Sequence, residues 1–313
     1  MSLTSVKSDK SEGQDAPSIA GRDFAANIVA VSCPACGHDN YKVHAVVDSS
    51  FRFCRCLGCR TIYQNPRLNE SGIQSQYGAG YFATNNVCSG YLNYAHTSEQ
   101  QRKTAAWLWK QVRSFSGGMP QRVLDVGCGS GAFLNEGIRR NLECWGIDFY
   151  LPSAEPRYRF VRGDFARADL PAKFFDLVVF HDSFEHFPEP NLPLRRCEEI
   201  LQPGGHILVN TPDPDSWLAR ISGSSWISLK HEHLVIYPRR ILAGLLQQHH
   251  FLNPIRVASR QYANWSYLKP RLQRLSPALA RVMNWLCASV AEKPFLVPTG
   301  GMIMIARHTN AKS

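Results

Sequence analysis

The feature that most constrains the fold is a regular alternation of short apolar runs with helical stretches, which begins near Arg122. The apolar runs are 123–125, 144–148, 159–161, 175–180 and 206–210, and the helical stretches are 132–141, 192–201 and 238–250. Strands that alternate with helices favour a mostly parallel sheet with both faces covered. We expect a last strand at 301–307 to close this sheet.

A glycine-rich segment, Asp125 to Gly131, joins the first strand of this pattern to the first helix. Gly127, Gly129 and Gly131 alternate with other residues, and a backbone without Cβ atoms turns sharply and lies flat against a ligand. In open α/β sheets the ligand crevice lies at the carboxyl ends of the strands, which is where this segment falls. No Gly-Lys-Ser/Thr follows, so a phosphate-binding P-loop is excluded.

Acidic residues end three successive strands of the pattern, Asp125, Asp148 and Asp164. Asp148 stands about where a carboxylate would accept the hydroxyls of a ribose. The simplest alternative is a glycine turn followed by ordinary aspartates at strand ends. Without a phosphate-binding lysine, the three carboxylates instead predict a pocket for a cationic nucleoside rather than for a polyphosphate.

As a set, these motifs resemble the class I S-adenosylmethionine-dependent methyltransferases, over about residues 105–250. Segment 125–131 resembles their first motif, and segment 163–165 resembles their adenine-contacting motif. The resemblance implies an α/β fold with a doubly wound, mostly parallel seven-stranded sheet, and methyl transfer from S-adenosylmethionine. The cofactor-binding residues that it implies are Asp125, Gly127, Gly129, Gly131, Asp148, Asp164, Phe165, His181 and Tyr81. The segment 151–156 departs from the family, because its two prolines forbid an ordinary helix.

Two C-x-x-C pairs near the N-terminus predict a zinc ribbon, with 19 residues between Cys36 and Cys56. The predicted metal ligands are Cys33, Cys36, Cys56 and Cys59. Cys54 is a further candidate thiol. With four protein ligands the Zn²⁺ site would be closed and therefore structural. A redox role is disfavoured, since no thioredoxin-like βαβ pattern surrounds the pairs. A ribbon ahead of this domain is similar to methyltransferases encoded in bacterial polysaccharide and secondary-metabolite clusters.

Candidate catalytic residues fall in two clusters, one after the strand at 175–180 and one before the helix at 238–250. The candidate general bases are His181, His186, His231 and His233, with Asp182 and Glu185 beside the first two. The run from Asp182 to His186 also resembles the metal-binding E-x-x-E-H of ubiquinone-pathway and small-RNA O-methyltransferases, with Asp in place of the first Glu. That resemblance leaves a divalent metal as an alternative to a general base, and helix capping as a purely structural one.

The C-terminal third is basic, since 233–291 contains eight Lys and Arg residues and no Asp or Glu, in a chain of net charge +10. Such a segment attracts phosphates. A stripe of apolar residues within 269–290 suits either an anionic membrane surface or packing on the domain or in a homodimer. No export signal or apolar run long enough to span a membrane is present. We therefore expect a cytoplasmic protein, with peripheral contact to the inner membrane face as one alternative and packing on the domain or in a homodimer as the other.

The sequence thus predicts four regions: a disordered tail at 1–27, a zinc ribbon at 28–68, an aromatic linker with a covering helix at 69–118, and a methyltransferase domain at 119–313 with a basic insertion at about 255–298. We expect O-methylation of a sugar or related hydroxylated small molecule, on a phosphate-bearing nucleotide or lipid carrier. The alternatives are an RNA methyltransferase and a non-catalytic interaction module. The few bases in the ribbon disfavour nucleic acid.

Overall fold

The structure is a computed structural model that describes residues 27–47, 51–76, 98–149, 156–275, 281, 285 and 293–309. Tyr81, the tail, the segment 151–155 and most of 276–292 lie outside these described residues. The predictions made for those parts of the chain therefore stay predictions.

A seven-stranded sheet forms the centre of the molecule, with the order β12-β13-β10-β9-β6-β7-β8. The strands are β6 (Arg122–Val126), β7 (Glu143–Asp148), β8 (Arg159–Arg162), β9 (Phe175–His181), β10 (Leu201–Pro212), β12 (Phe251–Ala263) and β13 (Phe295–His308). Neighbouring strands from β8 to β10 pair in parallel, whereas β13 runs antiparallel to both β10 and β12. This confirms the predicted doubly wound, mostly parallel sheet of the class I methyltransferase type.

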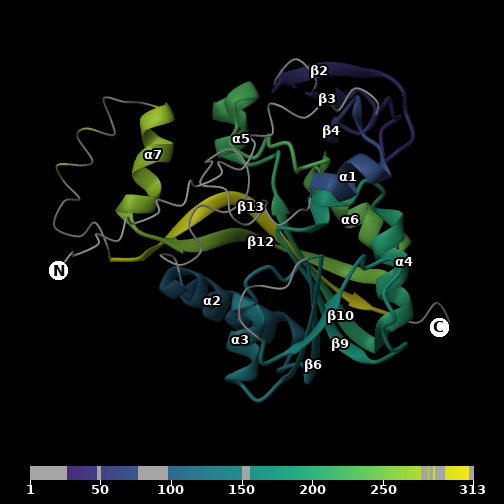
Figure 1. Cartoon of the computed structure of the whole chain (residues 1–313), viewed down its shortest axis with the longest axis vertical. Helices are drawn as coiled ribbons and strands as arrows, with labels where there is room; N and C mark the ends of the chain where they lie inside the picture. Colours follow the sequence, from purple (N-terminus) through teal and green to yellow (C-terminus); the bar gives the residue numbers. More distant parts are fainter. Residues whose placement is uncertain are drawn as a thin grey trace, which may run out of the picture.

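Helices cover both faces of this sheet, as the alternation of apolar runs predicts (Figure 1). One face carries α2 (Ser98–Ser116) and α3 (Ala132–Ile138), and the other carries α4 (Asn191–Ile200) and α6 (Arg239–Gln248). Trp109 of α2 stacks on Phe133 of α3 at 4.3 Å between ring centroids, and its indole N–H donates to the Phe133 carbonyl. This contact anchors α2 to the helix that follows the glycine-rich segment.

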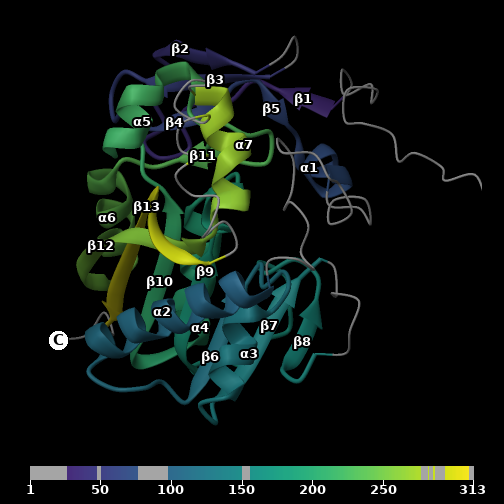
Figure 2. The ribbon, with the colours of Figure 1, turned by 90° about the vertical axis from the view of Figure 1, so that its left-hand side faces the viewer.

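A second, four-stranded sheet has the order β11-β4-β3-β2 and lies above the large sheet in Figure 2. Its first three strands along the chain are β2 (Tyr41–Val46), β3 (Arg52–Cys56) and β4 (Ile62–Gln64), while β11 (Val235–Ile236) comes from far downstream. The short strands β1 (Ile28–Val29) and β5 (Arg67–Leu68) pair with each other and lead into α1 (Glu70–Gln76). Cys33, Cys54 and Tyr63 share one apolar core with Phe180 and Phe184, so the ribbon packs directly on the large domain.

The C-terminal region differs in extent from the predicted insertion. β12 and β13 remain paired out to Ala263 and Phe295, so residues 255–263 and 295–298 belong to the sheet, and the final strand starts before the predicted 301–307. The helix α7 (Trp265–Leu275) follows β12, and α5 (Trp217–Ser222) packs against β13. Within the described residues, no helix is both long enough and apolar enough to cross a membrane.

Candidate functional site

The glycine-rich segment forms a tight turn between β6 and α3, at the carboxyl end of β6. Gly127, Gly129 and Gly131 have φ angles of 75°, 51° and 69°, a region that residues with a Cβ adopt only at a cost. The backbone N–H of Gly129 donates to Oδ2 of Asp148 at 2.9 Å. The glycine segment and the predicted ribose-binding carboxylate therefore meet at one edge of the sheet.

Close packing leaves no room for a side chain at Gly127 or Gly131. A Cβ on Gly127 would lie 2.7 Å from Cβ of Ser183, and a Cβ on Gly131 would overlap the ring of Tyr158. Ser183 follows β9, and its hydroxyl donates to the carbonyl of Val126 at 2.6 Å. The turn is thus held by two neighbouring segments, which keeps its backbone N–H groups in fixed directions.

Asp125 lies at the base of the turn and is buried. Burial, together with the nearby charge of Asp148, raises the pKa of its carboxyl to about 8. Its Oδ1 atom has no hydrogen-bond partner among the described residues. An unsatisfied buried carboxyl oxygen close to a second carboxylate favours a cationic ligand at this edge, which fits the nucleoside pocket that the sequence predicts.

Three further predicted cofactor residues lie at the same edge with differing exposure: Asp164 and Phe165 after β8, and His181 at the end of β9. Asp164 is partly exposed, and its Oδ1 accepts the N–H of Ala166 at 3.0 Å. Phe165 is buried, with its ring edge-on to Phe180 at 5.7 Å between centroids. His181 ends β9 and keeps part of its ring exposed. Phe165 therefore contributes to the core as well as to the wall of this edge.

Three of the predicted catalytic residues gather behind the end of β9: Glu185 and His186 in a single 3₁₀ turn (Phe184–His186), and His233. One nitrogen or oxygen atom from each lies within 4.8 Å of the other two. Nε2 of His233 lies 3.7 Å from Oε1 of Glu185, and Oγ1 of Thr211 donates to Oε2 at 3.0 Å. We call these three residues the Glu185 cluster.

Burial sets the protonation states in the Glu185 cluster. It raises the pKa of Glu185 to about 8, with a further contribution from the charge of Asp182, and it lowers the pKa of His186 to about 3. The pKa of His233 is also lowered, first by burial and then by His186. Nδ1 of His233 lies 2.8 Å from the Ser228 carbonyl, so a neutral ring carries its proton there and presents Nε2 as a lone pair toward Glu185.

The remaining candidates do not join this cluster. Asp182 is exposed and accepts a hydrogen bond from Nδ2 of Asn210 at 2.9 Å, while His181 lies beside it at 3.8 Å. His231 has its ring against Phe51 of the ribbon, at 5.1 Å between centroids. The predicted metal set of Asp182, Glu185 and His186 is therefore replaced by one in which His233 takes the place of Asp182.

Sequence reasoning missed the polar partners of these groups. Asn210 and Thr211 end the strand next to β9, and polar residues after an apolar run at that point could have been recognised as site residues. The side-chain amide of Gln64 lies close to the carbonyls of Lys230 and His233. No sequence pattern indicates this contact, because it joins segments more than 160 residues apart.

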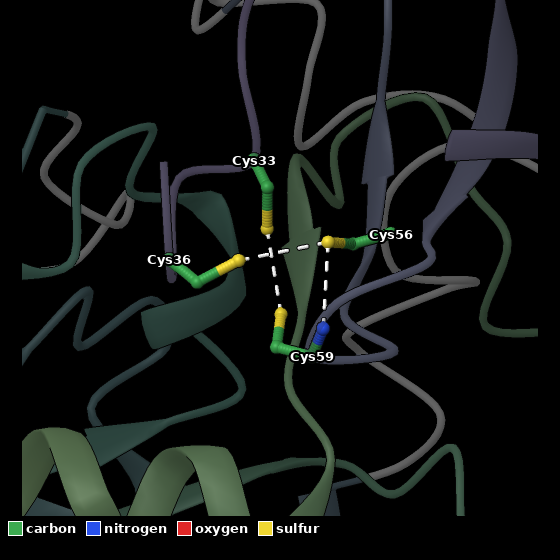
Figure 3. Close-up of side chains that lie close together, drawn as sticks. All are labelled: Cys33, Cys36, Cys56 and Cys59. Carbon is green, nitrogen blue, oxygen red and sulfur yellow. Dashed lines mark hydrogen bonds between the residues drawn. The ribbon is translucent and has the colours of Figure 1, made fainter. Parts of the chain in front are cut away.

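The four predicted zinc ligands converge on one point, as Figure 3 shows. Sγ of Cys33 lies 3.6 Å from that of Cys59, and Sγ of Cys36 lies 3.6 Å from that of Cys56. Four thiolates around a tetrahedral zinc ion, with Zn–S bonds of 2.3 Å, would have sulfur atoms about 3.8 Å apart. The donor set and its spacing therefore fit Zn²⁺.

The hydrogen bonds around Cys56 favour its thiolate, whereas burial raises the pKa of Cys33 and Cys36. Although burial raises the pKa of Cys56, the backbone N–H of Cys59 and the thiol of Cys36 bring it down to about 7. Cys54 lies outside the cluster, where its thiol is buried and directed toward the carbonyl of Asn65 at 3.5 Å. The ambiguity over Cys54 is thereby resolved in favour of the two C-x-x-C pairs.

Comparison with known proteins agrees with this geometry. The family model described as "Methyltransferase domain" matches residues 94–253, which is just over half of the chain. The chain belongs to the methyltransferase-domain family. Its similarity to this family covers the glycine-rich turn, Asp148 and the Glu185 cluster, but not the cysteine cluster.

Among curated proteins, the chain is similar to the ubiquinone biosynthesis O-methyltransferase of Leptothrix cholodnii, with 29% identity over 136 residues, 39% of this chain and 56% of that protein. The enzyme of the same name from Alkalilimnicola ehrlichii is 32% identical over 34% of this chain and 49% of its own length. The chain thus spans about half the length of these curated relatives. Among solved structures, the 1,6-didemethyltoxoflavin-N1-methyltransferase of Burkholderia thailandensis matches with a TM-score of 0.49 and 16% identity, covering 85% of this chain and 98% of that one.

Proposed function

We propose that this protein is an S-adenosylmethionine-dependent O-methyltransferase that acts on a hydroxylated small molecule. The observation that carries this proposal is the buried Glu185 cluster, which lies at the same sheet edge as the glycine-rich turn. The curated relatives are named as O-methyltransferases, which supports an oxygen atom as the acceptor. Membership of the methyltransferase-domain family supports the reaction class.

In this proposal the glycine-rich turn and its carboxylates hold the cofactor. Asp148 accepts hydrogen bonds from the ribose hydroxyls, and the glycine turn allows the backbone to approach the nucleoside closely. Burial and Asp148 disfavour the charged form of Asp125, so a cationic ligand beside it would favour the ionised carboxylate. When bound, S-adenosylmethionine supplies an electrophilic methyl group on a cationic sulfur atom. The protein's own contribution is to align the acceptor oxygen and to remove its proton.

Glu185 is the residue that we assign to proton removal. A general base works best when its pKa lies near the working pH, and burial brings the pKa of Glu185 to about 8. The hydroxyl proton passes to Oε1, the oxygen that faces His233, while Thr211 holds the other oxygen. His233 orients the carboxyl through its Nε2 lone pair, and the Ser228 carbonyl fixes the tautomer of that imidazole.

A divalent cation at the Glu185 cluster is the alternative way to activate the hydroxyl. Two neutral imidazoles and one carboxylate form a donor set that suits zinc or another first-row metal, which would lower the pKa of the acceptor hydroxyl. The two versions differ in their response to chelators. Transfer that survives removal of this metal, while the cysteine cluster keeps its zinc, identifies Glu185 as the base.

The cysteine cluster is proposed to hold one structural Zn²⁺. Its four thiol groups come from two short turns, so metal binding would add to the folding energy that the ribbon gains by packing on the large domain. A metal analysis of the purified protein that finds no zinc, in the absence of chelators, would contradict this assignment.

The proposed activity is tested with methyl-labelled S-adenosylmethionine and a lysate of cells that lack this protein. Wild-type protein should transfer label to a small molecule, and calorimetric titration should detect cofactor binding. Glu185→Gln should bind S-adenosylmethionine with unchanged affinity and lose at least a hundredfold in transfer rate, since general-base catalysis contributes about 10²–10⁴-fold. Asp176→Asn is the matched control, because it makes the same carboxyl-to-amide change at the opposite end of β9, and it should leave the transfer rate unchanged. No cofactor binding by the zinc-loaded wild-type protein would refute the proposal.

The finer expectations about partners also stay proposals. A sugar acceptor on a phosphate-bearing carrier and a contact of 269–290 with an anionic membrane both rely on free positive charge. Arg239 and Arg256, which precede 269–290, form ion pairs with the buried Asp213 at 2.7 and 3.3 Å, so they offer less free charge to a phosphate-bearing carrier. Label that appeared in RNA, with a steep salt dependence of binding, would favour the RNA methyltransferase instead.

A further inference from the structure

The zinc ribbon and the catalytic region share one sheet. Strand β4 of the ribbon pairs antiparallel with β11, so that Tyr63 faces Val235 and Ile62 faces Ile236. The loop that precedes β11 carries His231, Glu232 and His233. The ribbon therefore lies directly beside the loop that delivers an imidazole to the Glu185 cluster.

Gln64, the last residue of β4, connects the two parts. Its side chain is fully buried, and its Nε2 donates to the His231 carbonyl at 2.8 Å. The carbonyls of His233 and Lys230 lie at 3.2 and 3.3 Å from the same nitrogen. In addition, the backbone N–H of Gln64 donates to the Leu234 carbonyl at 3.0 Å. Gln64 thus contacts the carbonyls of four of the five residues 230–234.

The far side of the loop is bonded to the catalytic turn. The N–H of Leu234 donates to the Glu185 carbonyl at 2.8 Å, and the N–H of His233 donates to the Lys230 carbonyl at 3.1 Å. The loop at 230–234 therefore lies between Gln64 on one side and Glu185 on the other. If the Gln64 amide is removed, the carbonyls of His231 and His233 lose this donor, whereas the backbone bond from Gln64 to Leu234 stays in place.

The cysteine cluster is joined to Gln64 through a very short segment. The N–H of Cys56 donates to the Thr61 carbonyl at 2.9 Å, and the thiol of Cys59 lies 3.1 Å from the Thr61 hydroxyl. Thr61 is buried and immediately precedes β4. Loss of metal from the second C-x-x-C pair would therefore alter the contacts of Thr61, and Thr61 is joined to Gln64 by the three-residue strand β4.

We propose that Gln64 is a positioning residue through which the metal-loaded ribbon fixes the loop at 230–234, and with it His233, against Glu185. This inference rests on the proposed function for its catalytic meaning, but the mechanical connection can be measured without any methyl transfer. The ribbon would then help to position His233 in the active site, although all four ligand positions of its own metal site are filled by cysteines.

The test is a four-state cycle of backbone hydrogen exchange in the full chain, read by mass spectrometry on peptides that cover 228–238. The four states are wild type and Gln64→Met, each with zinc bound and after chelation. Methionine has nearly the length of glutamine but lacks the donor. In wild type, chelation should speed exchange of the loop about tenfold, as expected for the loss of a buried hydrogen bond. In Gln64→Met the loop should exchange fast with zinc bound, and chelation should add less than threefold.

Two controls separate positioning from general loss of structure. Ile62→Val removes one buried methylene group from the same strand and should respond to chelation as wild type does. Peptides covering β6 should stay protected in every state. The proposal is wrong if chelation speeds hydrogen exchange of the loop equally in wild type and Gln64→Met. It is also wrong if chelation leaves the exchange rate of the wild-type loop unchanged. Titration with S-adenosylmethionine, which should bind both proteins equally, tests the proposed function separately.

Discussion

Replacing Gly131 by alanine is the sharpest test of the glycine-rich turn, because the chain offers a matched control. Gly131 has a φ of 69° and stands directly before α3, and a Cβ there would overlap the ring of Tyr158. Gly117, just after α2, has a φ of 70° and no atom within 4 Å of an added Cβ. The two alanine variants share the backbone strain and differ in the clash.

The expected losses in the free energy of unfolding follow from the backbone strain and the steric clash. Left-handed backbone costs an alanine about 1–2 kcal/mol, which applies to both variants. Forcing a Cβ into the buried Tyr158 ring adds about 1–3 kcal/mol for Gly131→Ala alone. We therefore expect a loss of about 2–5 kcal/mol for Gly131→Ala and of about 1–2 kcal/mol for Gly117→Ala. Only the first variant should lose affinity for S-adenosylmethionine, since the turn must move away from Tyr158.

Urea unfolding gives the two stabilities, and calorimetric titration gives the two affinities. The double variant Gly131→Ala with Tyr158→Leu should recover part of the lost cofactor affinity, because the smaller side chain leaves room for the new methyl group. If both single variants lose equal stability and Gly131→Ala binds the cofactor as well as wild type does, the close packing of the turn has no role in binding.

Three further predictions concern single groups. Cys36→Ser should abolish zinc retention and Cys54→Ser should not, as metal analysis after gel filtration will show; equal zinc content would contradict the four-ligand cluster. Asp148→Asn should weaken S-adenosylmethionine binding at least tenfold by calorimetry, whereas Asp176→Asn, which loses similar bonds from backbone N–H groups at the other end of the sheet, should leave it unchanged. Because burial raises the pKa of Asp125 to about 8, wild-type stability should fall as pH rises from about 4 to 8; Asp125→Asn should flatten that slope in unfolding experiments, and parallel slopes would refute the assignment.

Local patterns explain why so much of the sheet was predictable. The apolar runs at β6, β7 and β9 are buried on both faces, so they stand out as continuous runs in the sequence. Glycine turns and strand-end carboxylates have fixed places relative to such strands, which is why Gly129 and Asp148 meet as expected. The two C-x-x-C pairs are equally local, since tetrahedral metal binding dictates their spacing.

What the sequence could not provide is the pairing of distant segments. His233 is one of four candidate histidines, and its loop lies beside Glu185 through contacts that join distant segments: the Leu234 N–H donates to the Glu185 carbonyl, and β11 pairs with β4. Asp182 precedes Glu185 by three residues, as a helical metal motif requires, but the turn there is 3₁₀ and Asp182 itself has a φ of 56°. The left-handed backbone directs Asp182 to Asn210 and away from the cluster.

The basic C-terminal third shows the same limit for charge. The stretch from 233 to 291 has no acidic residue, yet Asp213, some twenty residues earlier, lies buried between Arg239 and Arg256. A buried carboxylate needs such partners, because an unpaired charge in this environment would be strongly disfavoured. Part of the excess positive charge of this region therefore neutralises Asp213. The proposed contact with an anionic carrier or membrane would then involve the other basic residues of the region.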